Sequence, residues 1–204
     1  MAKTGRPRTF DREEAVEQAM YLFWQNGYES TSLSQLKAAI AGGITAPSFY
    51  AAFGSKEALF LECAQRYLAT WAHVTECLWD TDLPPRTAIE TALLQSARMQ
   101  CGEGHPKGCM VGLGTMSAPS EKNAAITEPL TRSRARTRAG ITACIKRGIA
   151  SGELRAGTNI AALTTVFDSF LLGLSILARD DVALDAMEGA ISLVMRNWDA
   201  ETRD

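Results

Sequence analysis

The segment 45–59 constrains the fold of this chain more than any other part of the sequence. Thr45 supplies a side-chain oxygen for a helix start, and the proline two residues later is tolerated only in a first helical turn. Phe49 and Phe53 are four residues apart, so they share one face that can anchor a short helix to a core. Gly54 permits a sharp reversal, and the serine after it can cap the next helix. A short, exposed helix held between two others is the layout of a helix-turn-helix motif.

The rest of the chain also predicts helices. Apolar residues recur with a period near 3.6 in almost every segment, and no run alternates as a strand would. Asp11 with Glu14, and Ser32 with Gln35, form capping boxes that begin two helices, and Gly27 is expected to end the first. Further helices are expected over residues 86–100, 109–117, 122–151, 159–178 and 182–198. We therefore predict an all-α protein.

Two domains are expected. A long helix that begins after Ser55 should run past Trp71 toward Trp79, and Pro84-Pro85 is the clearest break in the sequence. The first three helices and the start of the fourth would form a small domain over residues 1–56. Residues 57–204 would form a larger helical domain.

The first third of the chain resembles the DNA-binding domain of the TetR family of bacterial transcriptional regulators. The resemblance is carried by Thr31-Ser32-Leu33, Gly43-Ile44-Thr45, the run 48–53 and the run 55–60, together with the run 19–24 and Gly27-Tyr28-Glu29 upstream. It implies a homodimer with an N-terminal helix-turn-helix DNA-binding domain and a helical effector-binding and dimerisation domain. The implied function is a ligand-responsive repressor that binds a palindromic double-stranded DNA operator. An unknown small molecule would be the effector, and neither a cofactor nor a metal is expected.

Candidate DNA-binding residues follow from the resemblance. Phosphate contacts are expected from Thr31, Ser32, Tyr50 and Lys56, through hydroxyls, helix N-termini and an ammonium group. The alternative is that three of these, Tyr50 excepted, serve only as caps or solvated surface. A basic arm with Arg6 and Arg8 could enter a minor groove, or it could be a solvated tail.

We expect few polar contacts between protein side chains and DNA bases. Between Thr45 and Phe53 there is no Arg, Lys, Asn or Gln, so no side chain there can make a bidentate contact to a base. The base-facing candidates are Thr45, Ala46, Pro47 and Ser48, with support from Gln35 and Lys37 and from DNA shape. The stretch 36–44 is about two residues longer than is common in the family, which we expect to widen the turn at Gly42-Gly43.

The last two helices carry more apolar surface than one core requires. The predicted dimer-interface residues are Phe170, Leu174, Met187, Ile191 and Val194. The alternative is that these residues are buried within one subunit. The resemblance favours the interface, because members of the family pair their last two helices in a dimer.

An effector pocket is expected among the helices of the larger domain. Its candidate residues are Trp71, Trp79, Met99, Cys109, Met116 and Phe167, although the sequence does not separate pocket from core. Cys109 would lie in the first turn of a helix next to Lys107, an arrangement that favours a thiolate. A redox- or electrophile-sensing role for Cys109 is therefore an alternative to reversible ligand binding.

Composition excludes several other classes of protein. The net charge of −2 requires any DNA contact to come from a local patch. The N-terminus has no apolar signal core and no stretch is expected to span a bilayer, so no membrane association and a cytoplasmic location are predicted. Five cysteines without an export signal argue against structural disulfides. Clustered acids and a phosphate loop are missing, which argues against an enzyme, whereas a helical interaction module without DNA binding stays open.

Two smaller patterns favour simple interpretations. His73 and Cys77 are four residues apart on one helix, but no further residue has metal-ligand spacing. The four arginines 132, 134, 136 and 138 are expected to be solvated or paired with acids, although one side of this helix could attract an acidic effector.

Overall fold

Helices make up the fold of this chain, in a computed structural model that describes residues 10–114 and 121–202. The α-helices are α1 (Arg12–Ser30), α2 (Leu33–Ala39), α3 (Ala46–Phe53), α4 (Lys56–Ala69), α5 (Pro85–Cys101), α6 (Met110–Leu113), α7 (Ala124–Ser151), α8 (Ile160–Arg179) and α9 (Leu184–Asp199). The 3₁₀ helices are η1 (Ile40–Gly42), η2 (Trp71–Trp79) and η3 (Glu121–Asn123). No strand occurs in these ranges, and the only pairing of that kind is an isolated bridge between Leu154 and Thr202. The all-α prediction is confirmed.

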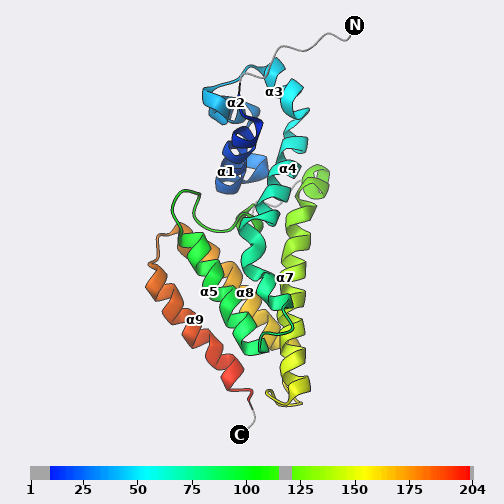
Figure 1. The fold of residues 1–204 in the computed structure, drawn as a ribbon, viewed down its shortest axis with the longest axis vertical. Helices are drawn as coiled ribbons and strands as arrows, with labels where there is room; N and C mark the ends of the chain where they lie inside the picture. Colours follow the sequence, from blue (N-terminus) through cyan, green and yellow to red (C-terminus); the bar gives the residue numbers. More distant parts are fainter. Residues whose placement is uncertain (1–9, 115–120, 203–204) are drawn as a thin grey trace.

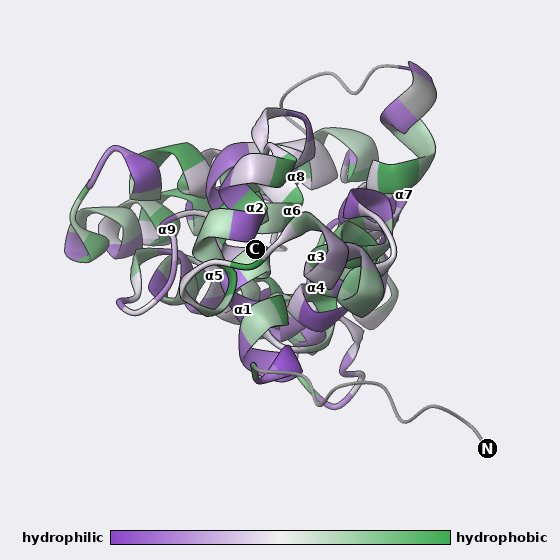
Figure 2. Cartoon of the chain, turned by 90° about the horizontal axis from the view of Figure 1, so that it is seen from above, coloured by the Kyte–Doolittle hydropathy of each residue, from purple (hydrophilic) through white to green (hydrophobic). Residues whose placement is uncertain are grey.

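The molecule is elongated, with a small group of helices at one end (Figure 1). Helices α1, α2 and α3 form this end, while α5, α7, α8 and α9 run along the larger part. Helix α4 begins in the small part and leads into the larger one. Figure 2 shows α9 in both hydrophilic and hydrophobic shades, as expected for a helix with one buried face.

Local capping fixes where the first helices begin. The Asp11 carboxylate accepts hydrogen bonds from the N–H groups of Glu13 and Glu14, and the Ser32 and Gln35 side chains form a complete capping box. At Gly27 the backbone adopts φ 79° and breaks the helical path, although α1 resumes for one further turn. Gly27 therefore kinks the first helix rather than ending it.

The predicted long fourth helix is interrupted. Helix α4 ends at Ala69, because Thr70 has non-helical angles (φ −122°, ψ −78°) and its hydroxyl donates to the carbonyl of Arg66. The chain then continues as the 3₁₀ helix η2, which is tighter than an α-helix and unusually long for its type. The expectation of one continuous helix to Trp79 was wrong.

Two hydrophobic clusters form the core. The first contains buried residues of α1, α2, α3 and α4, and also Met110, Val111 and Leu130 from the larger domain. The second is built from η2, α5, α7, α8 and α9. Leu59, Phe60 and the other buried residues of α4 pack in the first cluster together with α1, α2 and α3. The core of the small domain thus extends past residue 56, and a domain boundary at this residue stays a prediction.

Candidate nucleic-acid interface and effector cavity

Helix α3 presents one face to the core and the other to solvent. Phe49 and Phe53 are buried, and their rings lie 5.3 Å apart. Thr45 caps the helix by accepting a hydrogen bond from the N–H of Ser48. On the outer side, Tyr50 is 51% exposed, which is unusual for a large aromatic side chain. The exposed face thus combines two small hydroxyl groups with one phenol.

The turn between α2 and α3 has an uncommon backbone. Ala41, Gly42 and Gly43 all have positive φ angles, of 51°, 70° and 118°. The N–H of Ile44 reaches back to the carbonyl of Lys37 at 2.8 Å and closes the widened turn. The two glycines adopt such angles without steric penalty, whereas Ala41 carries a Cβ that disfavours them.

Gln18 attaches this turn to the first helix. Its side-chain oxygen accepts a hydrogen bond of 2.8 Å from the N–H of Ala41, while its amide nitrogen donates to Glu14 on the preceding turn. The contact fixes the position of the turn relative to α1.

At the start of α2, the structure separates two residues that were expected to act together. Ser32 is exposed at the helix N-terminus, where its backbone N–H donates to Gln35. Thr31 is fully buried and its hydroxyl donates to the carbonyl of Gly27 at 2.7 Å. The predicted phosphate contact of the Thr31 hydroxyl was wrong, because this group is already used to close the kink in α1.

Lys56 begins α4 in a partly covered position. Its ammonium lies 4.2 Å from the centre of the Tyr28 ring, and partial burial lowers the pKa of Lys56. Lys56 stands three residues after the end of α3. Among the other predicted DNA contacts, Ala46 and Lys37 are half-buried, Pro47 and Gln35 are exposed, and Arg6 and Arg8 lie outside the described residues.

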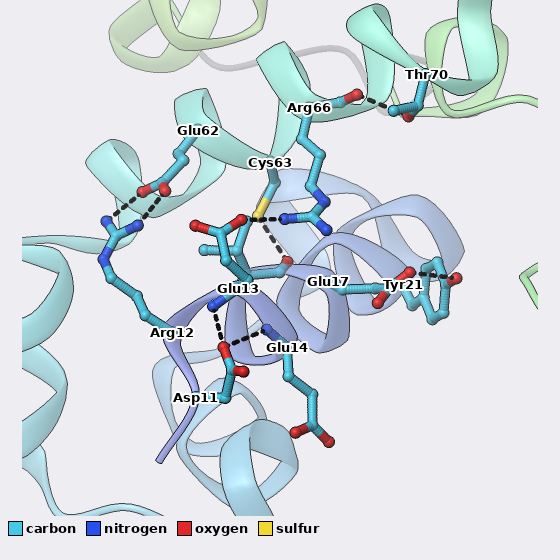
Figure 3. A network of polar contacts seen from close by, with 11 residues as sticks. Asp11, Arg12, Glu13, Glu14, Glu17, Tyr21, Glu62, Cys63, Arg66 and Thr70 are labelled. Carbon is cyan, nitrogen blue, oxygen red and sulfur yellow. Dashed lines mark hydrogen bonds and ion pairs between the residues drawn. The ribbon is translucent and has the colours of Figure 1, made fainter. Parts of the chain in front are cut away.

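Ion pairs join α1 to α4 (Figure 3). Both guanidinium nitrogens of Arg12 contact the carboxylate of Glu62, and Arg66 donates to Glu13 at 2.6 Å. Below them, the Cys63 thiol donates to the carbonyl of Val16. These contacts, together with the buried face of α4 in the first core cluster, attach α1 to α4.

The larger domain contains a cavity. The cavity and the solvent-filled space at its opening together enclose about 510 Å³ that no protein atom occupies. Its lining residues come from η2, α5, α6, α7 and α8 and from the cap of α6: Ala72, Val74, Thr75, Ser96, Met99, Gln100, Cys109, Val111, Gly112, Ser133, Arg134, Thr137, Asp168, Leu171, Leu172 and Ser175. The space inside it that a water-sized sphere can reach is about 50 Å³, so a ligand larger than a few water molecules would have to displace the walls.

The cavity contains only part of the predicted pocket. Met99 and Cys109 line it. Phe167 lies in the second core cluster with no exposed surface, and Trp79 is 41% exposed beneath the guanidinium of Arg136. Trp71 packs on His105, with ring centres 4.5 Å apart. These three residues do not line the cavity, and Met116 lies outside the described residues.

Cys109 has a different environment from the one expected. The Tyr67 hydroxyl donates to its sulfur at 3.3 Å. The ammonium of Lys107 donates instead to the backbone carbonyl of Cys101, and the helix that follows Cys109 has only four residues. Lys107 thus makes its hydrogen bond to a backbone carbonyl and not to Cys109, and a thiol-sensing role for Cys109 stays a prediction.

A short chain of hydrogen bonds joins the cavity wall to the small domain. The carbonyl of Gln100 accepts from the N–H of Gly108 at 3.1 Å, and the carbonyl of Gly108 accepts from the Trp24 indole at 3.0 Å. Arg179 at the end of α8 donates to the carbonyls of Trp24 and Gln25. Gly108 has φ +82°, and a Cβ there would lie 2.9 Å from the carbonyl oxygen of Ser175. Any residue other than glycine at position 108 would therefore displace neighbouring atoms.

The outer faces of α8 and α9 are apolar. Ile176, Leu177 and Leu193 are 40%, 36% and 57% exposed, and Phe170 and Val194 are partly exposed. By contrast, Leu174, Met187 and Ile191 are at most 1% exposed. Assigning these last three to a dimer interface was wrong, because they face the core of their own subunit. The sequence period indicated two apolar faces on each helix but did not say which one points inward.

Helix α8 also corrects the expectation about membranes. With 20 mostly apolar residues it is long and apolar enough, by length and composition alone, to cross a bilayer, and 33% of its most apolar window is buried within the subunit. The same exposed apolar surface is what a dimer interface between soluble subunits would cover.

The two smaller patterns have simple explanations. The Cys77 thiol donates to the carbonyl of Ala88, and the described residues contain no group of three His, Cys, Asp or Glu side chains able to hold a metal. Among the arginines 132–138, Arg132 pairs with Glu128, Arg136 with Glu76, and Arg138 with Asp168.

Comparison with known proteins identifies both parts of the chain. Residues 15–63 match the family described as bacterial regulatory proteins, tetR family, and residues 89–194 match the tetracyclin repressor-like C-terminal domain. The HTH-type transcriptional repressor ComR of Escherichia coli is 29% identical over 195 residues, covering 95% of this chain and 91% of the relative. The repressor BdcR of the same organism is 36% identical over 107 residues, which cover 52% and 53% of the two chains.

A solved structure agrees with these matches. A cysteine-substituted variant of the TetR family transcriptional regulator CifR, in complex with a 26-base-pair double-strand operator DNA, superposes with a TM-score of 0.82. It is 33% identical, and the match covers 95% of this chain and all of that chain. The helix-turn-helix with an exposed α3, joined through α4 to a helical domain with its own cavity, belongs to a transcriptional regulator that is not an enzyme: this chain is a member of the TetR family.

Proposed function

We propose that this protein is a ligand-responsive repressor that binds a two-fold symmetric operator as a homodimer. The observation that carries the proposal is the exposed face of α3, whose Tyr50 is half exposed while its two phenylalanines hold the helix to the core. ComR, BdcR and CifR support it as relatives whose names describe repressors or an operator complex. As a regulator of bacterial genes it would act in the cytoplasm.

Dimerisation follows from the surface of α8 and α9. Ile176, Leu177 and Leu193 would leave a large apolar patch in water if the subunit stayed alone. Gly173 and Gly189 have open space where a Cβ would stand, so a second copy could approach both helices closely. Two subunits would place two copies of α3 at a fixed spacing, as a palindromic operator requires.

The route from effector to DNA would pass through the cavity wall. Cys109, Val111 and Gly112, at and after the cap of α6, line the cavity, and neighbouring residues of α6 pack into the core of the small domain. A ligand that displaces this segment would also pull on Gly108 and through it on Trp24. Because α1 and α4 are joined by ion pairs, the displacement would change the spacing of the two α3 helices and release the operator.

The proposal is tested by gel-shift titration with the DNA upstream of the protein's own gene. The wild-type protein is expected to bind this duplex more tightly than a scrambled duplex of equal length. Ser48→Glu places a negative charge on the exposed face of α3 and should abolish binding, because it repels phosphate. Ser151→Glu, at the exposed end of α7, is the matched control and should bind as the wild type does. Equal binding of both variants would refute the assignment of α3.

A further inference from the structure

One buried polar atom in the cavity has no partner. Gln100 is 2% exposed, and its side-chain oxygen forms no hydrogen bond within the described part of the chain. A buried acceptor without a partner destabilises the folded state by roughly 1–3 kcal/mol. Such an atom is rare in folded proteins and indicates a group that another molecule completes.

Gln100 is well placed to meet a ligand. It stands near the end of α5 among the residues that line the cavity, and its backbone carbonyl accepts a hydrogen bond from Gly108. Its side-chain oxygen is buried, so a ligand would have to displace part of the wall to reach it. The hydroxyl-bearing residues Ser96 and Ser175 line the same cavity and are each only 2% exposed. Their hydroxyls can both donate and accept hydrogen bonds.

The rest of the wall is mainly apolar. Ala72, Val74, Met99, Val111, Leu171 and Leu172 supply most of the hydrocarbon surface. The charged lining residues are Arg134 and Asp168, and the Asp168 carboxylate is paired with Arg138 at 2.6 Å. Arg134 donates to the carbonyl of Val111 at 2.7 Å. A charged ligand would lose its hydration against this mainly apolar wall, which favours an uncharged molecule.

We infer that the effector is a small, uncharged, largely apolar alcohol or phenol whose hydroxyl donates a hydrogen bond to Gln100 Oε1. The inference rests on the proposed function, because it names the ligand class of the same cavity. A hydroxyl fits better than an amine or a carboxylate, since it remains neutral and can accept from a serine while it donates to Gln100. Hydrocarbon analogues should bind less well, because they would leave the Gln100 oxygen buried and unsatisfied.

The entrance is also defined. A second hollow between η2 and α7 shares Ala72, Thr75, Ser133 and Thr137 with the cavity and opens to solvent. Glu76 and Arg136 line this hollow and pair with each other at 2.9 Å, while Pro129 of α7 lines it too. This hollow is the side from which a ligand would reach the cavity.

The test compares matched probes by titration calorimetry on the full chain. The pairs are 2-phenylethanol with n-propylbenzene, and cyclohexylmethanol with ethylcyclohexane, in which a methyl group replaces the hydroxyl. The affinity ratio of alcohol to hydrocarbon is expected to be about tenfold higher in the wild type than in Gln100→Leu. Gln95→Leu, on the exposed side of the same helix, is the control and should keep the wild-type ratio.

A second measurement, of melting temperature, tests the inference without any ligand. Because Gln100→Leu removes an unsatisfied acceptor, its melting temperature should exceed that of Gln95→Leu by about 2–4 °C. A lower melting temperature would mean that Gln100 has a structural role and would overturn the inference. The inference is also overturned if the affinity ratio is equal in the wild type and Gln100→Leu, if no alcohol binds, or if phenylacetate binds more tightly than 2-phenylethanol.

The gel-shift assay separates this inference from the proposed function. Operator binding by the wild type and by Gln100→Leu, together with an unchanged probe ratio, would refute the ligand class alone. Failure of the wild type to bind its upstream DNA would instead refute the proposed function.

Discussion

The guanidinium of Arg179 donates to the backbone carbonyl of Trp24 at 2.9 Å, and this contact joins the last residue of α8 to the first helix of the DNA-binding domain. The carbonyl lies three residues before the kink at Gly27. A residue of the larger domain thus contacts the backbone of α1 close to this kink.

Removing the contact of Arg179 should weaken the attachment of α8 to the end of α1. Arg179→Met keeps the aliphatic stem but loses both hydrogen bonds, and we expect a loss of about 1 kcal/mol in stability. Hydrogen exchange should accelerate in the last turns of α1. Arg196→Met, in the last turn of α9, is the control and should leave exchange in α1 unchanged. Equal exchange in α1 for both variants would show that Arg179 does not hold the junction.

The phosphate contacts predict a salt dependence. Tyr50→Ala and Lys56→Ala should each weaken binding to all DNA sequences similarly, because phosphates carry no sequence information. For Lys56→Ala the slope of log affinity against log salt should also fall by about one. Lys146→Ala, an exposed lysine of α7, should not change the slope. Identical titrations of the wild type and Lys56→Ala at low and moderate salt would contradict the role of Lys56.

The conformation of the turn between α2 and α3 predicts that two substitutions change the stability of the protein in opposite directions. Ala41→Gly should stabilise the protein by about 1 kcal/mol, because the left-handed angle of Ala41 costs a Cβ-bearing residue about this much. Ala39→Gly should destabilise it by about as much, because Ala39 has helical angles. Urea unfolding followed by circular dichroism measures both. A loss of stability in Ala41→Gly would mean that the turn tolerates alanine without strain.

The exposed apolar face predicts the oligomeric state. Ile176→Glu combined with Leu193→Glu should give a folded monomer that loses operator binding, because charges cannot be buried unpaired in an interface. Leu61→Glu, a comparably exposed leucine of α4, should remain a dimer. Sedimentation equilibrium gives the mass in each case. A wild-type protein that sediments as a monomer would overturn the dimer mechanism.

Tyr28 predicts a loss of stability in alkali. Burial, with a contribution from Glu57, raises the pKa of Tyr28 to about 12 from an ordinary value of 10.0. The unfolded chain therefore releases this proton first, and stability falls as pH rises from about 10 to about 12. Tyr28→Phe keeps the ring beneath Lys56 but does not titrate. Urea midpoints of the wild type and Tyr28→Phe should converge or cross above pH 10, and a constant difference would contradict the pKa.

Local signals in the sequence predicted the small domain well. The caps at Ser32 and Thr45 and the face shared by Phe49 and Phe53 depend on residues within one or two turns, so the sequence contains the whole interaction. Contacts across the fold were less accessible, such as the hydrogen bond from the Trp24 indole to the carbonyl of Gly108. Thr31 was assigned to phosphate although its partner Gly27 is only four residues away, because the sequence predicted a helix end there and not a kink.

The cavity and the interface show the same limit. Helical periodicity predicted apolar faces on α8 and α9, but choosing Leu174 instead of Ile176 required knowledge of which face packs against α5 and α7. Gln100 was missed for a related reason. A glutamine near a helix end is ordinary in a sequence, and only its burial without a partner distinguishes it.

Met110, Val111 and Leu130 complete the core of the DNA-binding domain although they lie far along the chain. The core of the DNA-binding domain is therefore not closed without these residues of the larger domain. Engineered chimaeras face the same condition. A transplanted DNA-binding domain should fold in a new host only if it brings α4 and α6 and the first turns of α7 with it, so specificity for DNA and for ligand are inherited together.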